Sequence, residues 1–390
     1  MQNKGPAERK TLCVNGWLTL SRRHYHSQGA GTITPSDDLL DAAGDLISLG
    51  TRQLCCQLNR GARSFDMAAQ NLLEAGRLSL SAEKLRQVVE AEGRAVLTLL
   101  HEGELQPVWN ASQCQTPDGK TRVYMSSDGF MAPTITDQEK QARRKKVMEQ
   151  RKKHKGKKRR LPALKPGTDG RYKEFKLVMF YDQDLTRKQV SVTRRGCNQA
   201  GKLMIRDAWR LGINAAEERL ANIDGGPWII NQIRRYRQRL NLTATGLDFF
   251  HLGENVHETR RILFGEQDEQ GKRTADDLLH TAKHQGYQPL REKLLALRQN
   301  KRGAKRKEAD RLIDYVSDRR EMIRYPEFIE NGWQIGSGPM ESQCRVTPDR
   351  VKGPGKRWDL DHAEEIMALE AMCQSGQCPA YWKLAMSGKN

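Results

Sequence analysis

The spacing of apolar residues changes several times along the chain, and each change predicts a different element. Residues 10–23 alternate apolar and polar positions around Gly16, which predicts two short strands in a hairpin. Between residues 37 and 100 apolar side chains recur at helical spacing, with Ser81 placed to cap the last helix. The break at Gly76 suits a helix-turn-helix, although a generic helical bundle explains the same pattern.

The middle of the chain has the pattern of a sheet. Residues 122–130 predict a strand that ends in an Asp-Gly turn, and residues 172–184 and 187–195 predict two more strands of an antiparallel meander. An amphipathic helix is predicted over 200–222. With TGLDFFHL at 245–252, the pattern predicts an α/β fold with a mixed sheet and helical cover.

The full length of 390 residues is enough for two or three domains. From Gly253 to about Tyr325 the chain is almost purely helical and charged, which predicts an inserted helical domain. We therefore expect a short β element over 1–36, a helical region over 37–110, an α/β core over 120–252, an all-helical insertion over 253–330, and the last part of the core over 331–390.

Positive charge is concentrated in one short segment. The chain has a net charge of +19 and a pI of about 9.7, which indicates a polyanionic partner. Residues 140–160 hold 13 Lys and Arg against one Glu, a net +12. This run, within a basic insertion over 138–170, repels itself and lacks the apolar residues needed to bury anything, so we expect a mobile loop unless a counter-ion pairs with it. Its predicted role is phosphate binding, with a solvated linker and a nuclear address as alternatives; the candidate DNA-binding residues are Arg143, Arg144, Lys145, Lys146, Arg151, Lys152, Lys153, Lys157, Lys158, Arg159 and Arg160.

Other features of the composition exclude some classes of protein. There is no run of about 18 apolar residues, and the first ten residues lack the apolar core of a signal peptide. We therefore expect a soluble chain that is not secreted and has no membrane partner. Eight scattered cysteines suit a reducing compartment, so we expect free thiols, including Cys373 and Cys378.

Three acidic residues lie at the end or start of predicted elements: Asp128 in SSDGF, Asp224 in NIDGGPW and Glu341 in GSGPMES. Each alone is a weak signal, because Asp-Gly is an ordinary turn and Gly-Ser-Gly-Pro an ordinary loop. Together, in a chain whose charge predicts phosphate, they point to a specific chemistry. Three such carboxylates can hold two Mg²⁺ ions for in-line phosphoryl transfer.

Several long strings, in order, resemble the DDE transposases of bacterial insertion sequences of the ISKra type. They are SSDGFMAPTITDQEKQARRKKV, YKEFKLVMFYDQD, DGGPWIINQI, GLDFFHLGENVHE and IGSGPMESQCRVTPDRVKGPGKRW, and the resemblance covers about Lys10 to Trp382. It implies a ribonuclease H-like core and a mainly helical N-terminal DNA-binding region. It also implies that Asp128, Asp224 and Glu341 are the catalytic residues and the ligands of two Mg²⁺ ions, with Mn²⁺ as a substitute.

The same resemblance marks a second pair of residues. Asp248 and His251 match an Asp-x-x-His signature that such enzymes carry between the second Asp and the Glu. We interpret the pair as support for the site at a strand end. The alternative is that His251 is a satisfied, half-buried histidine.

The activity that the resemblance implies is DNA transposition by a bacterial mobile element. Such an enzyme cleaves DNA at the ends of an insertion sequence and transfers the 3′-hydroxyl into target DNA. It would act in the cytoplasm at the nucleoid, as a homodimer or larger synaptic assembly, with the 253–330 insertion shaping the DNA channel. The alternatives are a catalytically silent, transposase-derived DNA-binding protein, a ribonuclease H-like nuclease, and a scaffold that uses the 253–330 helices.

One departure from the family concerns zinc. Related members carry Cys-x-x-Cys spacing near the amino end, where this chain has Ser27 and Ala30. Cys13, His24 and His26 do not make a convincing tetrahedral set, so we expect a degenerate zinc-ribbon-like element and no zinc. This departure also fits a chain that begins inside a longer ancestral reading frame.

Two aromatic and basic segments near the last carboxylate are further candidates. Trp333 is placed to stack on a base near the cut, although core packing is the other interpretation. In RVKGPGKRW, glycines would let cations approach a phosphate backbone while Trp358 anchors the loop. The candidate DNA-binding residues here are Trp333, Arg345, Lys352, Lys356 and Arg357.

Overall fold

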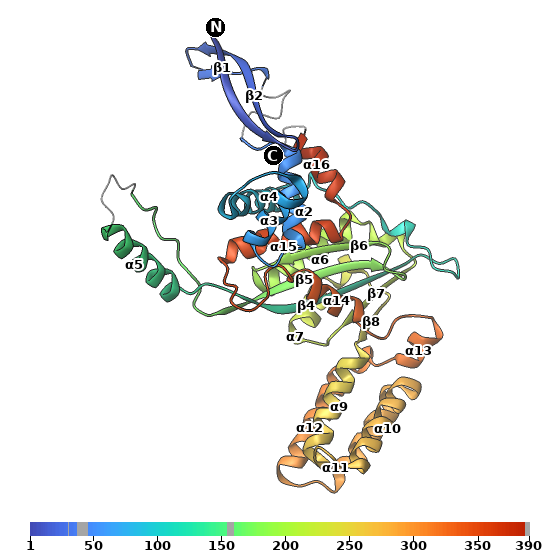
Figure 1. The fold of residues 1–390 in the computed structure, drawn as a ribbon. Helices are drawn as coiled ribbons and strands as arrows, with labels where there is room; N and C mark the ends of the chain where they lie inside the picture. The colour runs from blue at the N-terminus through green and yellow to red at the C-terminus, as the bar shows by residue number, and fades with distance from the viewer. Residues whose placement is uncertain (30, 37–45, 154–159, 387–390) are drawn as a thin grey trace. The chain divides into compact units, whose positions relative to one another are not determined.

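The computed structural model describes residues 1–29, 31–36, 46–153 and 160–386. Ala30 and the first part of the predicted helical region, residues 37–45, therefore lie outside the described residues. The chain forms two compact units (Figure 1). The first unit comprises residues 1–108, 131–174 and 347–390, and the second comprises residues 109–130 and 175–346.

The first unit begins with a three-stranded antiparallel sheet. It consists of β1 (Gln2–Cys13), β2 (Gly16–Ser27) and β3 (Gly31–Ile33), in that order. The predicted hairpin around Gly16 is confirmed, and its strands are longer than expected. Leu12 is buried, and its backbone N–H donates to the carbonyl of Leu46 at 2.8 Å, which ties the hairpin to the helices that follow.

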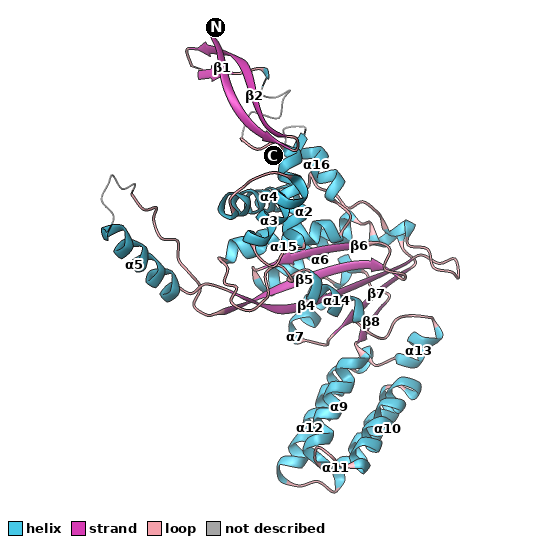
Figure 2. Ribbon diagram, in the orientation of Figure 1, coloured by secondary structure: helices cyan, strands magenta, loops and turns pink. Residues whose placement is uncertain are grey.

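Among the residues that the structure describes, five helices pack together as the body of this unit (Figure 2). They are α2 (Leu49–Arg60), α3 (Phe65–Gly76), α4 (Ala82–Glu102), α15 (Leu360–Gln374) and α16 (Cys378–Met386). The predicted cap of α4 is confirmed, because Ser81 Oγ accepts from the backbone N–H of Lys84 at 3.2 Å. The buried face of α4 includes Leu85, Val88, Val89 and Val96, and α4 packs along α15.

Gly93 lies where α4 and α15 approach each other closely. A Cβ atom at Gly93 would lie 2.4 Å from the carbonyl oxygen of Glu365, so alanine requires the helices to separate. We expect Gly93→Ala to lower the free energy of unfolding by about 1–3 kcal/mol or more, measured by urea denaturation. Gly61→Ala is the control, because a Cβ there meets nothing within 4 Å and φ is −86°. Equal losses in the two variants would contradict this account of the helix contact.

The basic insertion contains a helix, α5 (Asp137–Lys153), so the predicted mobile loop is wrong over these residues. Thr136 and Glu139 form a capping box: the Thr136 N–H donates to Glu139 Oε2 at 3.0 Å, and the Glu139 N–H donates to Thr136 Oγ1 at 3.2 Å. The Lys, Arg, Gln and Glu that follow are good helix formers, which the charge argument did not weigh. No residue of α5 is buried, so the helix has no core-facing side.

The expectation of free thiols is wrong for Cys373 and Cys378, which form a disulfide. Between α15 and α16 the chain turns through Gly376, whose φ of +69° favours glycine. The turn brings the two Cα atoms to 5.2 Å, a separation that sequence spacing alone did not indicate. The other six cysteines, all within the described residues, are free thiols: Cys13, Cys55, Cys56, Cys114, Cys197 and Cys344.

The second unit is built on a five-stranded mixed sheet, in agreement with the predicted α/β class. The strand order is β6-β5-β4-β7-β8. Strand β7 pairs in parallel with both β4 and β8, whereas β5 and β6 pair with each other in antiparallel orientation. The strands are β4 (Arg122–Pro133), β5 (Tyr172–Asp182), β6 (Lys188–Thr193), β7 (Glu218–Ile223) and β8 (Ala244–Leu247).

Two predictions about this sheet are wrong. The predicted turn at Asp128 does not form, because β4 continues through Asp128 and Gly129 to Pro133. The predicted helix over 200–222 is α6 (Gly196–Arg210), which is followed by Gly212 with φ +59°. Residues 218–223, Glu-Arg-Leu-Ala-Asn-Ile, are the strand β7, which is almost completely buried. Its polar and apolar residues do not alternate strictly, so the pattern does not distinguish a strand from a continuing helix.

The rest of the unit is helical, and the predicted all-helical segment is confirmed as helical (Figure 2). After β7 come α7 (Pro227–Arg235) and α8 (Arg237–Leu240), and after β8 come α9 (Phe249–Phe264), α10 (Glu269–Gln285), α11 (Tyr287–Gln299), α12 (Gly303–Asp318), α13 (Tyr325–Glu330) and α14 (Gly338–Val346). Short 3₁₀ turns lie at Ala111–Gln113, Ile213–Ala215 and Arg320–Met322. Within the described part of the chain, none of the helices has the length and apolar character needed to cross a bilayer.

Candidate functional site

The five candidate site residues all belong to the second unit, and all except Asp128, which lies in the middle of β4, are at or near the ends of its elements. Asp128 lies in β4, Asp224 directly follows β7, and Asp248 directly follows β8. His251 and Glu341 lie in the first turns of α9 and α14. Because β7 and β8 are parallel neighbours, their carboxyl ends meet at one edge of the sheet, where open α/β sheets bind ligands.

Asp248 is fully buried, and its carboxylate accepts four hydrogen bonds. One oxygen, Oδ1, accepts from the N–H groups of Phe250 at 2.6 Å and His251 at 3.0 Å, which caps α9. The other, Oδ2, accepts from the N–H of Ser337 at 2.5 Å and from the Ser337 hydroxyl. Burial opposes ionisation, but the hydrogen bonds from His251 and Ser337 outweigh it and lower the pKa of Asp248 to about 2.

This arrangement gives Asp248 a positioning role. Ser337 lies just before α14, and its carbonyl accepts from the N–H of Glu341 at 3.1 Å. Asp248 therefore connects the start of α9 to the start of the helix that carries Glu341. All four of its described hydrogen bonds are internal, so it has little capacity left to bind a cation.

His251 is half-buried and carries a positive charge at neutral pH. Its Nδ1 lies 3.6 Å from Asp248 Oδ1, a distance typical of an ion pair rather than of a hydrogen bond. The interaction with Asp248, helped by the charges of Glu254 and Asp224 and opposed by burial, raises the pKa of His251 to about 9. Nδ1 has no hydrogen-bond partner among the described residues, so the geometry fits the supporting role through an ion pair better than a histidine satisfied by hydrogen bonds.

The raised pKa of His251 predicts a pH dependence of folding stability. A raised pKa stabilises the fold fully below the ordinary value of 6.5, and this stabilisation is lost as the pH rises through about 9. We expect the free energy of unfolding, measured in urea with EDTA, to fall between these two pH values more steeply for the wild type than for His251→Gln. Parallel pH profiles of the two proteins would contradict this expectation.

Asp128 contacts α14, the helix that carries Glu341, through Cys344. Asp128 Oδ1 accepts from the N–H of Gly129 at 2.6 Å, and Cys344 Sγ lies 3.7 Å from Asp128 Oδ2. Cys344 follows Glu341 by three residues, so the two share one face of α14. Burial raises the pKa of Asp128, and the negative charge of Asp224 raises it further.

The loop that carries Asp224 is held by the end of the helical insertion. Gly225 has φ +77°, and the N–H of Gly226 donates to Asp224 Oδ1 at 2.8 Å. Arg319 donates twice to the Gly225 carbonyl, from Nη2 at 2.7 Å and from Nε at 3.1 Å. Asn222 Nδ2 donates to the Gln334 carbonyl at 2.8 Å, which connects β7 to the segment before α14.

Sequence reasoning missed several of these supporting residues. Ser337 carried a usable signal, because a serine two residues before Pro339 is a typical helix start. Arg319 and Asn222 carried none: nothing in their local sequence distinguishes them from other surface or strand residues. Cys344 could be placed only after Glu341 had been assigned to a helix.

The donor set fits a hard divalent cation. Asp128 and Asp224 each use one oxygen to accept a backbone N–H, and Glu341 is exposed. Oxygen ligands of this kind suit Mg²⁺ or Mn²⁺. The ligand atoms of Asp248, His251 and Glu341 lie within 4.8 Å of one another. Asp128 and Asp224 are not part of this close group, so their role as metal ligands together with Glu341 stays a prediction.

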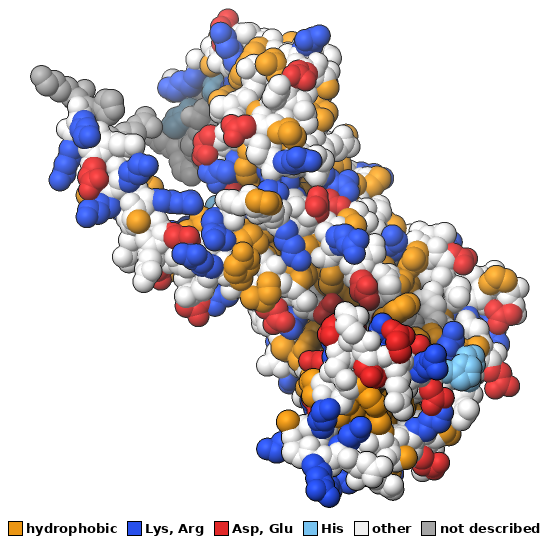
Figure 3. Space-filling model, turned by 60° about the horizontal axis from the view of Figure 1, so that its bottom comes forward, with side chains coloured by type: hydrophobic (Ala, Val, Ile, Leu, Met, Phe, Trp, Pro, Cys, Tyr) orange, Lys and Arg blue, Asp and Glu red, His pale blue; other side chains and the backbone are white. Residues whose placement is uncertain are grey.

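The predicted DNA-binding residues of the basic insertion lie on and after α5. Lys157, Lys158 and Arg159 are outside the described residues, and Arg160 directly follows the gap. Figure 3 shows Lys and Arg side chains along the α5 segment. Arg144 is half-buried, and its Nη1 donates to the Pro162 carbonyl at 2.7 Å. The other described cations are Arg143, Lys145, Lys146, Lys152 and Lys153, which are exposed, and Arg151, which is half-buried.

Trp333 and the loop RVKGPGKRW, both predicted to contact DNA, make structural contacts within the protein. Trp333 is half-buried, with its ring centroid 5.6 Å from that of Phe328, which fits the core-packing alternative. Lys356 Nζ donates to two carbonyls of its own loop, at 3.1 and 3.0 Å. The predicted anchor is confirmed, because Trp358 is buried and its Nε1 donates to the Val351 carbonyl at 2.9 Å. DNA contact by Lys352, Lys356, Arg357 and Arg345 stays a prediction.

Comparison with models of known protein families gave no match, and comparison with curated proteins gave none either. The resemblance to DDE transposases therefore rests on the sequence strings given above.

Proposed function

We propose that this protein is a metal-dependent DNA transposase with a ribonuclease H-like core. The observation that carries the proposal is the arrangement of Asp128, Asp224 and Glu341. They come from three separate elements of one unit. The negative charge of Asp224 contributes to the raised pKa of Asp128. Two carboxylates whose charges act on each other, as those of Asp128 and Asp224 do, are less costly when a cation binds between them. The mixed sheet supports the proposed core.

The residues divide into two roles. Asp128, Asp224 and Glu341 would hold two Mg²⁺ ions, which when bound supply a Lewis acid for the attacking and leaving oxygens of a phosphodiester. Asp248 fixes the starts of α9 and α14 and so sets the place of Glu341. His251 holds a proton beside the carboxylates and would attract the phosphate of an approaching strand.

A basic face that sequence analysis missed supports a nucleic-acid substrate. Helices α6, α7 and α8 pack together and carry seven cations against one acid, Asp207, which is buried. Trp209, on α6, is 79% exposed. Exposed aromatic rings and cations on neighbouring helices are features that surfaces for nucleic acids combine. The cations are Lys202, Arg206, Arg210, Arg234, Arg235, Arg237 and Arg239.

The α5 helix is proposed to bind the DNA backbone. Replacing four exposed lysines, Lys145, Lys146, Lys152 and Lys153, by glutamine should weaken binding to all duplex sequences alike. Each lost phosphate contact should reduce the slope of log K against log salt by about 0.9. Binding would be measured by fluorescence anisotropy over a range of salt concentrations, in EDTA. A slope equal to that of the wild type would refute the role of α5.

The proposal as a whole is tested by a cleavage assay. The substrate is a duplex made from the DNA that flanks the reading frame, incubated with the full-length protein in Mg²⁺, Mn²⁺ or EDTA. We expect specific nicks at the element end with either metal and none in EDTA. Binding without cleavage in both metals would favour the catalytically silent alternative. Cleavage of an RNA strand in preference to DNA would favour the nuclease.

A further inference from the structure

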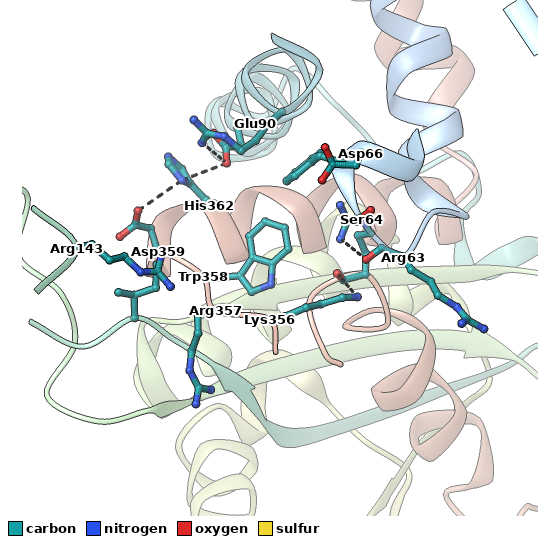
Figure 4. Close-up of a pocket in the computed structure, with 14 residues that line it drawn as sticks. Arg63, Ser64, Asp66, Glu90, Arg143, Lys356, Arg357, Trp358, Asp359 and His362 are labelled. Atoms are coloured by element: carbon teal, nitrogen blue, oxygen red, sulfur yellow. Dashed lines mark hydrogen bonds and ion pairs between the residues drawn. The ribbon is translucent and has the colours of Figure 1, made fainter. Parts of the chain in front are cut away.

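The first unit contains a cavity of about 520 Å³ that includes none of the proposed catalytic residues. It lies between the start of α3, the middle of α4, the start of α15 and the loop that precedes α15 (Figure 4). Trp358 lies at its centre, with Lys356 beneath the ring and the His362–Glu90 pair above it (Figure 4). Its size is within the range of pockets for small organic ligands.

Arg350, which lines this cavity, is a buried cation that forms no salt bridge with a carboxylate among the described residues, although the negative charge of Asp349 acts on it. Its side chain is fixed, because Nε donates to Asn59 Oδ1 at 3.0 Å and Nη1 to the Arg63 carbonyl at 3.4 Å. Only 6% of the residue is exposed, and Nη2 donates to no acceptor among the residues that the structure describes. Burial lowers the pKa of Arg350 to about 10. An uncompensated buried charge is costly, and an anionic ligand would offset that cost.

Two aromatic rings lie beside this cation. Phe65 and Trp358 meet edge to face, with centroids 5.8 Å apart. The Arg350 guanidinium lies 4.5 Å from the centroid of Phe65 and 5.5 Å from that of Trp358. Since the Trp358 Nε1 already donates to the Val351 carbonyl, the ring offers the cavity only apolar surface. An aromatic surface next to a fixed cation suits a ligand that has both a planar ring and an anionic group.

The charge of the cavity also favours an anion. Six cations and three carboxylates line it, which leaves a net +3 with His362 neutral. Two of the carboxylates are already neutralised: Glu90 accepts from Arg86 at 2.6 Å and lies 3.2 Å from His362, and Asp359 pairs with Lys140. Arg63 is exposed at the start of α3 and lines the cavity together with Arg350.

We propose that this cavity binds a nucleoside monophosphate, with the phosphate at Arg63 and Arg350 and the base against Phe65 and Trp358. Two sources share this chemistry: a free nucleotide and the 5′-phosphorylated terminal nucleotide of a DNA strand. The second source would add a strand-end site to the proposed transposase. Binding here requires neither metal nor cleavage, so its outcome is separate from that of the proposed function.

The test is calorimetric titration of the full-length protein in EDTA with deoxyadenosine 5′-monophosphate, deoxyadenosine and inorganic phosphate. We expect the monophosphate to bind at least tenfold more tightly than either fragment. Arg63→Gln and Phe65→Leu should each weaken it by at least fivefold, and Arg350→Lys should weaken it more. Arg63 is exposed and Phe65 is half-buried, so we expect both variants to fold. They therefore keep the test valid if Arg350→Lys does not fold. Arg23→Gln, an exposed position on β2, is the control.

Competition then identifies the source. A short single-stranded oligonucleotide that displaces the monophosphate only when it carries a 5′-phosphate supports the strand-end source. Failure of both oligonucleotides to compete supports the free nucleotide. The proposal is overturned if the wild type does not bind the monophosphate at millimolar concentration, or if Arg63→Gln and Phe65→Leu bind it as tightly as the wild type.

Discussion

Replacing Asp128 or Asp224 by asparagine, or Glu341 by glutamine, should reduce the rate of Mg²⁺-dependent DNA cleavage by at least about 10²-fold, the usual loss when one preorganised electrostatic group is removed from an active site. Each change removes one carboxylate from a set that is proposed to share two ions, so each should be nearly as severe as the triple replacement. Single-turnover cleavage of an end-containing duplex measures the effect.

The same variants should not lose folding stability, which separates a catalytic role from a structural one. Burial and Asp224 raise the pKa of Asp128, so its ionised form is disfavoured in the folded protein. Asp128→Asn removes that charge and should leave the free energy of unfolding in EDTA equal or higher. Glu330→Gln, on the exposed end of α13, is the matched control and should cleave normally. If any of the three site variants cleaves at the wild-type rate, the role proposed for that residue is wrong.

Asp248→Ala should cause the largest loss of stability of any single change in the second unit. It removes the acceptor of four hydrogen bonds from a place with no access to solvent. Breaking a buried, charged network of this kind costs about 3–5 kcal/mol, which urea denaturation would measure. Cleavage should fall as well, because α14 loses its connection to α9.

The chain offers a control of the same residue type in the same kind of position. Asp268 also caps a helix, α10, but it is only half-buried and accepts from the Gly271 N–H. Its replacement by alanine should cost about 1 kcal/mol, the ordinary value of an N-cap. Equal losses at Asp248 and Asp268 would show that Asp248 is a simple cap and does not position Glu341.

Much of the fold could be predicted from periodicity, and the failures have physical causes. The helices after Gly253 and the cap at Ser81 follow from local pattern, which the sequence carries directly. The strand β7 could not be told from helix because burial on both faces removes the alternation of polar and apolar positions. The helix α5 was missed because charge repulsion was weighed and helix propensity was not.

The candidate site was predicted as residue types but not as a geometry. Asp128, Asp224 and Glu341 could be proposed from their glycine neighbours and from the family resemblance. The positioning role of Asp248, which distinguishes it from these three residues, could not be predicted from the sequence. It depends on a hydrogen bond from Ser337, 89 positions away in the sequence. Likewise, the support that Arg319 gives to Gly225 joins two segments that no local pattern relates.

The central claim is that these carboxylates direct a metal-dependent transfer of DNA strands. The most direct measurement incubates the full-length protein with Mg²⁺, a supercoiled plasmid and a labelled duplex that ends in the DNA flanking the reading frame. We predict covalent joining of the labelled 3′-hydroxyl to the plasmid, absent in EDTA and in Asp224→Asn. Joining that persists in EDTA or in that variant, or no joining by a wild-type protein that binds the duplex, would contradict the proposal.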